Sequence, residues 1–254
     1  MAAKTTHIFY KNLNLFNSEI SQIVRKLSPG SKFLDIEFRQ AKDKENQPVL
    51  DLVCAFVSLP NGGMRNLKRV PQLTHSVFMT GRIKLHPTDK NSIIYYGTEI
   101  NYCKTINPSD PDKFECITGF HYDALVLNDG NPSKDNNHPI LHAQQNNKCG
   151  MRFFSEPEFS EFKGSYECIF PHEQLKDEIR SIRIPTPQMD MLSAIIMVIA
   201  DYLVHSSDEE HKKLFTEFLT RIYKKLIPLS FSSTTKINSD FASQQKLMSI
   251  WYPL

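Results

Sequence analysis

The stretch SIIYYGTEINYCKTI (residues 92–106), followed by NPSDPD (107–112) and KFECITGFHYDALVL (113–127), decides the fold. Both long runs are dense in β-branched and aromatic residues, which favour strands. The six residues between them are rich in Asn, Pro and Asp, as turns are. A parallel pair would need a crossover of a dozen residues or more, so the two strands are expected to pair antiparallel.

The same pattern extends outward on both sides of this pair. Further candidate strands lie at 32–38, 49–59, 75–85, 139–145 and 151–155, separated by turn signals such as PNGG and HPTDKN. No helix-length periodicity lies between these runs, which disfavours parallel β-α-β units. The sequence therefore predicts an α+β fold with an antiparallel meander sheet of about six or seven strands.

Helical patterns flank the strands. Apolar residues at spacings of three and four predict one N-terminal helix over 14–27, ended by SPG at 28–30. After the strands, Thr186 and Pro187 are suited to an N-cap and a first helical position. The helix expected from there to about residue 205 is apolar nearly all round, so it should be buried against the sheet.

A second C-terminal helix is expected to follow. Ser207 and Glu210 have the spacing of a capping box, and Pro228 ends the helical pattern. A short closing helix carries Phe241 and Trp251. These segments predict a single domain over 1–254, with the sheet in 31–155 and a helical layer in 186–254 on one sheet face.

Composition limits the classes of function. The 254 residues are 40% hydrophobic and 23% charged with a formal charge of +2, so no global field attracts nucleic acid. The five cysteines form no C-x-x-C pair and look like reduced residues. The first residues lack the uninterrupted apolar stretch typical of a signal peptide, and the apolar segment 193–204 is too short to span a bilayer. A cytoplasmic location without a membrane partner is expected.

The segment HPILHAQQ (138–145) contains the first candidate chemistry. On a strand, His138 and His142 share a face but lie about 13 Å apart, at about 3.3 Å per residue. They cannot both bind one metal ion. On the preceding strand, His121 and Asp123 also share a face, and pairing of the two strands would bring them near His142.

Two histidines and one carboxylate are enough for a transition-metal site or an acid/base pair. The catalytic candidates are therefore His121, Asp123 and His142, and the metal candidates are these three with His138. The register of the two strands is not determined by the sequence, because their connection is long. In the alternative interpretation these groups cover a solvated face or satisfy one another's hydrogen bonds.

Other motifs are weak or absent. The chain has no phosphate-binding glycine loop and no G-x-S-x-G elbow. The loop PNGGMRNLKR (60–69) combines paired glycines with Arg65, Lys68 and Arg69, which suits a nucleic-acid backbone, although such a loop is more often a solvated connection. The carboxylates in strand-like runs, including Asp51 and Glu99, do not have the spacing of a metal-dependent nuclease core.

The order of short motifs in the second half resembles a family of uncharacterised bacterial proteins known only as a domain of unknown function. The residues that carry the resemblance are Tyr122, Asp123, His138, Pro139, His142, Arg152, Arg183, Ile184, Pro185 and Pro187. The chain departs from the family pattern at Gln144, where a second histidine is expected. The resemblance implies a bacterial accessory protein, from a mobile or phage-defence locus, and no established activity.

The leading functional hypothesis is a non-enzymatic adaptor or accessory subunit that acts through protein contacts in a bacterial multi-protein system. Ile250, Trp251 and Tyr252 form an apolar C-terminal segment suited to partner binding. No cofactor is expected under this hypothesis. The first alternative is a metal-dependent hydrolase or nuclease using a divalent metal at the His/Asp cluster. The second is a nucleic-acid binder that uses the 60–69 loop and the basic helix around Lys224.

Overall fold

A computed structural model describes the elements of the fold and the short connections between some of them. The described residues are 7–29, 31–42, 46, 48–58, 75–86, 88–90, 92–107, 109–124, 141–145, 167–169, 183–185, 190–204, 208–227 and 230–231. None of the helices in these ranges is long and apolar enough to cross a membrane.

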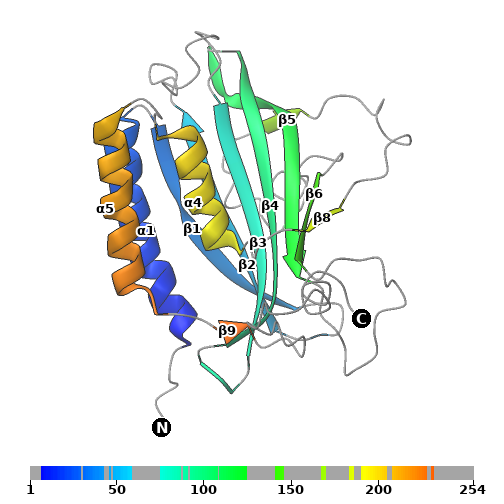
Figure 1. The fold of residues 1–254 in the computed structure, drawn as a ribbon. Helices are drawn as coiled ribbons and strands as arrows, with labels where there is room; N and C mark the ends of the chain where they lie inside the picture. The colour runs from blue at the N-terminus through cyan, green and yellow to red at the C-terminus, as the bar shows by residue number, and fades with distance from the viewer. Residues whose placement is uncertain are drawn as a thin grey trace.

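Five long strands form an antiparallel meander in the order of the chain (Figure 1). They are β1 (Ser31–Lys42), β2 (Pro48–Ser58), β3 (His75–Leu85), β4 (Ser92–Asn107) and β5 (Asp110–Ala124). Each pairs antiparallel with the next. The predicted α+β class is confirmed, and the five strands coincide with the predicted runs to within a few residues.

The predicted number of six or seven strands is not supported. Beyond the five-strand meander, four short strands complete a nine-stranded sheet: β6 (Leu141–Gln145), β7 (Glu167–Ile169), β8 (Arg183–Pro185) and β9 (Ser230–Phe231). β6 and β8 pair antiparallel, whereas β7 pairs parallel to β5 and β9 pairs parallel to β4. The five-residue β6 lies within the predicted run 139–145, but the other three strands, of two or three residues, carry too little periodicity to be recognised in a sequence. These three also lie outside the range 31–155 that the sequence assigned to the sheet.

The N-terminal helix α1 (Ile8–Leu27) begins six residues before the predicted start. The apolar stripe continues backward through Phe9 and Leu13, both 1% exposed. The His7 side chain accepts a hydrogen bond from the Phe9 amide at 3.1 Å and so caps the helix. A histidine cap is not among the common capping residues, which explains why the start was misplaced.

Both C-terminal helices use an aspartate as N-cap. In α4 (Met191–Tyr202), the Asp190 carboxylate accepts from the amides of Leu192 and Ser193, so the predicted start at Thr186 is wrong. In α5 (Glu209–Lys225), the Asp208 carboxylate accepts from the amides of Glu210 and His211. The predicted capping box beginning at Ser207 is therefore wrong by one residue. An aspartate competes well for both positions because its carboxylate also suits the positive end of the helix dipole.

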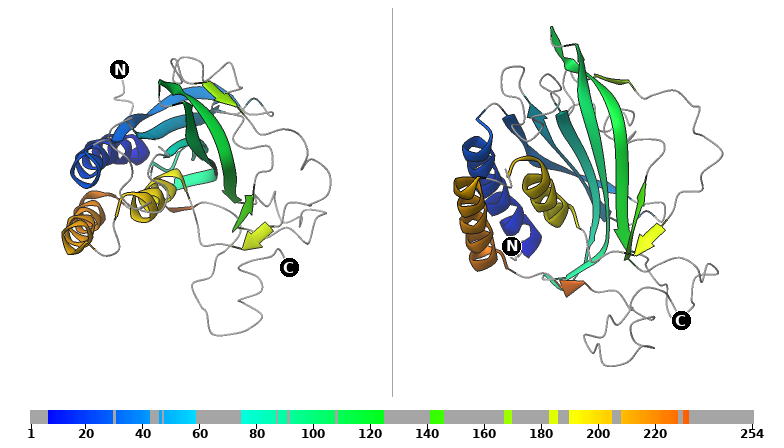
Figure 2. Two further views of the ribbon diagram at one scale, coloured as in Figure 1. Left: turned by 90° about the horizontal axis from the view of Figure 1, so that it is seen from above. Right: turned by 45° about the horizontal axis from the view of Figure 1, so that its top comes forward.

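The three helices lie on the same side of the sheet, as the view from above in Figure 2 shows. α1 packs on β1 and against α5, while α4 packs on β3 and β4. The main core lies between these layers and includes Phe16, Phe56, Tyr96 and Phe218. A smaller core of Val53, Ala55, Val57, Phe78, Cys103, Phe114 and Cys116 lies on the opposite face of the sheet. The described parts of β2–β4 are therefore largely buried on both faces.

Cys54, Cys103 and Cys116 are buried free thiols, as expected for reduced residues in apolar strands. Burial raises the pKa of the Cys54 thiol. Cys149 lies outside the described residues.

A β-bulge interrupts the pairing of β1 with β2 between Leu34 and Glu37. At this point the side chain of Asn17, on α1, makes two hydrogen bonds to the backbone of Ile36. Its Nδ2 donates to the Ile36 carbonyl at 3.0 Å, and its Oδ1 accepts from the Ile36 amide at 2.8 Å. The backbone amide and carbonyl of Ile36, in the irregular part of β1, are thus hydrogen-bonded by the helix that packs on the strand.

A buried carboxylate joins α1 to α5. Glu19 accepts hydrogen bonds from Lys225 at 2.5 Å and from Arg221 at 2.9 Å, and its side chain is 6% exposed. The hydrogen bond from Lys225, followed by that from Arg221, holds the pKa of Glu19 below its usual value despite the opposing effect of burial. The stabilisation from this group is complete above the ordinary glutamate pKa, about 4.3, and is lost as the pH falls through the lower pKa of the folded protein.

Glu19→Gln is expected to lower the free energy of unfolding at pH 7 by about 1–2 kcal/mol, because the amide keeps the packing but loses two charged hydrogen bonds. The difference from the unchanged protein should shrink as the pH falls below the ordinary glutamate pKa, about 4.3, and through the lower pKa of folded Glu19. Urea unfolding at several pH values measures both effects. Glu115→Gln is the control, since the ion pair of Glu115 with Lys104 is about one-third exposed and contributes little.

Candidate functional site

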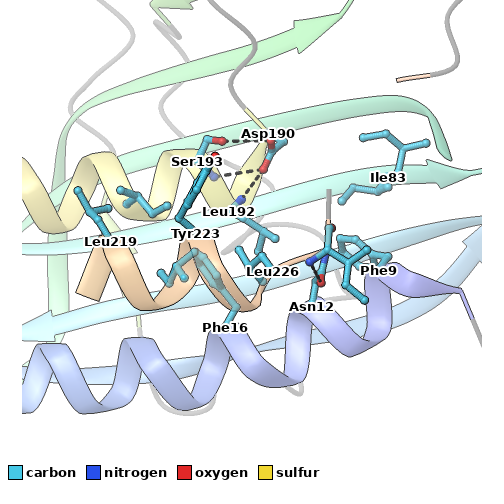
Figure 3. Close-up of a pocket in the computed structure, with 14 residues that line it drawn as sticks. Phe9, Asn12, Phe16, Ile83, Asp190, Leu192, Ser193, Leu219, Tyr223 and Leu226 are labelled. Carbon is cyan, nitrogen blue, oxygen red and sulfur yellow. Dashed lines mark hydrogen bonds between the residues drawn. The ribbon is translucent and has the colours of Figure 1, made fainter. Parts of the chain in front are cut away.

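A pocket of about 490 Å³ opens between the three helices and the sheet (Figure 3). α1 lines it with Phe9, Asn12 and Phe16, and the sheet contributes Ile83 and Ile93. The beginning of α4 and the second half of α5 close the remaining sides, with Asp190, Leu192, Ser193, Ile196, Leu219, Ile222, Tyr223, Leu226 and Ile227. The pocket therefore depends on where α1, α4 and α5 lie relative to one another.

The amide and carboxylate groups that line the pocket have structural partners. Asn12 donates from Nδ2 to the Ile227 carbonyl at 2.8 Å and accepts at Oδ1 from the Ile227 amide at 3.0 Å. Asp190 accepts from the Leu192 and Ser193 amides at 2.9 and 3.1 Å, and from the Ser193 hydroxyl at 3.1 Å. Asn12 thus joins α1 to the segment that follows α5, and Asp190 caps α4. What the pocket offers to a ligand is mainly apolar surface.

Exposed apolar residues of α5 and its C-terminal end form the rim of the pocket. Leu219 is 37% exposed, Ile227 is 41% exposed and Tyr223 is 88% exposed. Tyr223 follows Phe218 and Leu219 in the apolar pattern of α5, yet it is almost fully exposed. An almost fully exposed tyrosine beside an apolar pocket is typical of a residue that becomes buried on binding.

The candidate histidines lie on the other side of the sheet from the helices. β5 and β6 pair with Asp123 opposite His142 and with His121 opposite Gln144. Directly opposed residues of antiparallel strands share a face, as do residues two apart on one strand. The register therefore places His121, Asp123 and His142 on one face at neighbouring positions. His121 is half-buried, and whether the three side chains converge stays a prediction.

The neighbouring strands add polar residues to the same face. Glu99 on β4 lies directly opposite His121, and the Thr80 hydroxyl on β3 donates to the Glu99 carboxylate at 3.4 Å. Two residues along β4, Asn101 is 1% exposed. Neither its Oδ1 nor its Nδ2 has a hydrogen-bond partner in the part of the chain that the structure describes.

A buried ion cluster lies on this face across β1, β2 and β3. Asp51 is 1% exposed and accepts two hydrogen bonds from Arg82, from Nε at 2.6 Å and from Nη2 at 3.0 Å. A nitrogen of Arg39 lies 4.0 Å from the same carboxylate. The strand register places Arg39, Asp51 and Arg82 in one row. This row fixes the pairing of the first three strands.

Several predicted residues lie outside the described ranges, and their roles stay predictions. These are the metal candidate His138, the nucleic-acid candidates Arg65, Lys68 and Arg69, and the partner-binding candidates Ile250, Trp251 and Tyr252. Lys224, at the centre of the predicted basic helix, is exposed on α5. Arg183, one of the residues that carry the resemblance, lies in β8 opposite Gln144.

Function can also be sought by likeness to known proteins. No family model, curated protein or solved structure matches the chain. The function must therefore be inferred from the residues of the pocket and of the sheet face. Sequence reasoning missed the pocket, because its walls come from segments more than 200 residues apart. The spacing of Leu219, Tyr223 and Ile227 at every fourth residue was the only sequence feature that marked its rim.

Proposed function

We propose that this protein is a non-enzymatic accessory subunit that binds another protein through the pocket between α1, α4 and α5. The observation that supports the proposal is an apolar pocket whose amide and carboxylate groups already have partners and whose rim exposes Leu219, Tyr223 and Ile227. The described lining residues include no histidine, cysteine or lysine, and the Asp190 carboxylate caps a helix, which favours binding over catalysis.

The partner is expected to present an apolar or aromatic anchor to this pocket. The volume of about 490 Å³ accommodates a few large side chains, such as those on one face of an amphipathic helix. Tyr223 would pack against the flank of that segment and lose most of its exposure. The resemblance of the second half to bacterial accessory proteins is the support for a bacterial multi-protein system, including phage defence, as the setting.

Site-specific photo-crosslinking tests this proposal. Replacing Tyr223 by p-benzoylphenylalanine in the native host should give one discrete crosslinked protein. The same replacement at Glu217, which is exposed on α5 but does not line the pocket, should not give it. Tyr223→Asp should then abolish co-purification of that protein while changing the free energy of unfolding by less than about 0.5 kcal/mol.

Equal crosslinking at the two positions, or no crosslinked protein at position 223, would contradict the proposal. The alternative function of a metal-dependent hydrolase or nuclease depends instead on the opposite face of the sheet, and the pocket variants leave that face unchanged.

A further inference from the structure

Two cysteines lie directly opposite each other on neighbouring antiparallel strands. Cys103 on β4 pairs with Cys116 on β5, and both side chains are 0% exposed. Both belong to the smaller core, so they lie on the same face of the sheet, opposite the helices. Both are thiols in this structure, and the Cys116 thiol donates a weak hydrogen bond to the Thr118 carbonyl at 3.6 Å.

Directly opposed positions of an antiparallel pair nearly meet the distance requirements of a disulfide. Their Cα atoms lie about 4.5 or 5.5 Å apart, depending on the hydrogen-bonding pattern, and the Cα atoms of disulfides lie about 4.4–6.8 Å apart. Their Cβ atoms lie about 4.5–5.5 Å apart, whereas a disulfide brings them to about 3.5–4.5 Å. A shift of about 1 Å between the two Cβ atoms therefore allows the sulfurs to bond.

The strand pairing is irregular on both sides of the two cysteines. The register of β4 with β5 shifts between Tyr102 and Cys103 and again between Thr105 and Asn107, so three consecutive pairs lie between the two shifts. At the first shift Ile117 has no opposed residue on β4, and it is 48% exposed. A bulge disrupts the ladder locally, so these strands can adjust more readily than a regular ladder and admit a small oxidant.

The contacts that hold this part of the hairpin are modest. One of the three pairs is the ion pair of Lys104 with Glu115, which is about one-third exposed and contributes little. The neighbouring strand on the outer side of this part of β5 is β7, which has three residues. A covalent bond between β4 and β5 at this point would therefore fix residues 103–116 much more firmly than the present contacts do.

We propose that Cys103 and Cys116 form a redox-sensitive disulfide, with hydrogen peroxide as the oxidant. One sulfur attacks a peroxide oxygen and becomes a sulfenic acid, and the other oxygen leaves as water. The second sulfur then displaces the sulfenic oxygen as a second water, so two thiols and one peroxide give one disulfide and two waters. A thiol reductant reverses the bond. The device goes beyond the proposed protein-binding function and lies on the opposite side of the sheet from the pocket.

Peptide mapping of the full-length protein tests the bond. After treatment with hydrogen peroxide and alkylation of the remaining thiols, cleavage by trypsin after Lys104 and Lys113 places the two cysteines in separate peptides. These peptides should be recovered as one linked pair that dithiothreitol separates. The linked pair should be absent from Cys103→Ala and from Cys116→Ala.

The bond should also stabilise the protein. Closing the loop of residues 103–116 is expected to lower the equilibrium constant of unfolding by about 100-fold, because it restricts the unfolded chain. Urea unfolding of the oxidised and the reduced protein measures this change, and hydrogen exchange of the amides in 103–116 should slow on oxidation. Peroxide should produce neither effect in Cys103→Ala, which controls for oxidation at other residues.

Cys54→Ala and Cys168→Ala are matched controls for the choice of cysteines. Cys54 is buried in the main core on the other face of the sheet, where Met79 lies opposite it. The backbone of Cys168, on β7, lies opposite that of Phe114. Both variants should form the same linked pair as the unchanged protein does.

Recovery of the two cysteines in separate alkylated peptides after peroxide treatment would overturn the proposed bond, as would a link from either of them to a third cysteine. A linked pair that leaves both the unfolding equilibrium and the hydrogen exchange unchanged would overturn its role in fixing the hairpin. Tyr223→Asp should form the bond as the unchanged protein does, which separates this test from that of the protein-binding pocket.

Discussion

Replacing Phe218 by alanine is expected to lower the free energy of unfolding by about 3–5 kcal/mol. Phe218 is 0% exposed and, with Ile222, forms the part of α5 that enters the main core. Its ring lies 6.0 Å from that of Phe215, on the preceding turn. Truncation leaves a cavity that the sheet and α1 cannot fill by a small shift, because both pack against several other elements. Urea unfolding followed by circular dichroism measures the loss.

The matched control for this variant is Tyr223→Ala. Both changes remove an aromatic ring from α5, but Tyr223 is 88% exposed, so its loss should change stability by less than about 0.5 kcal/mol. Phe218→Ala should also loosen the wall of the pocket and weaken partner binding. A loss below about 1 kcal/mol would show that α5 is not docked as described.

Removal of the Asp51 carboxylate is expected to have the second-largest effect on stability. Asp51→Ala should cost about 2–3 kcal/mol, because it leaves the guanidinium groups of Arg82 and Arg39 without their shared anion in a largely buried row. The cost stays below that of a fully buried charge because the two arginine side chains are 33% and 32% exposed. Thermal or urea unfolding at pH 7 measures it.

A double variant tests whether the loss of stability comes from the unpaired charge of Arg82 or from the change of shape at position 51. Asp51→Leu combined with Arg82→Leu should recover much of the lost stability, since replacing both partners of a buried pair by apolar residues is often neutral. Glu115→Ala, which breaks the partly exposed pair with Lys104, should cost less than about 1 kcal/mol. Equal losses for Asp51→Ala and Glu115→Ala would contradict the importance of burial.

The long strands could be predicted because each contains many β-branched and aromatic residues between strong turn signals. β3 occupies the predicted range of 75–85 without any shift, and β4 differs from its prediction by one residue. The helix starts were less accurate, since His7, Asp190 and Asp208 compete with neighbouring residues that also resemble caps. Sequence spacing identifies a region that contains a cap, but contacts made in three dimensions select the residue.

The polar residues on the sheet face opposite the helices could be predicted only in part. Alternation along a strand placed His121 and Asp123 on one face, and the register in the structure puts His142 opposite Asp123. The sequence could not show that Glu99 lies opposite His121, because bulges shift the pairing of β4 with β5. It also could not show that Asn101 lies opposite Gly119, which has no side chain to form a hydrogen bond with it.

The bulge of β1 and its hydrogen bonds to Asn17 affect how readily another chain could add a strand at this edge of the sheet. β1 is at one end of the strand order, the position where another chain can add a strand to a sheet. The bulge bends this margin, and Asn17 occupies the amide and the carbonyl of Ile36 that an incoming strand would need. An incoming strand would therefore meet an irregular margin at which the amide and the carbonyl of Ile36 are already hydrogen-bonded by the helix that also lines the pocket.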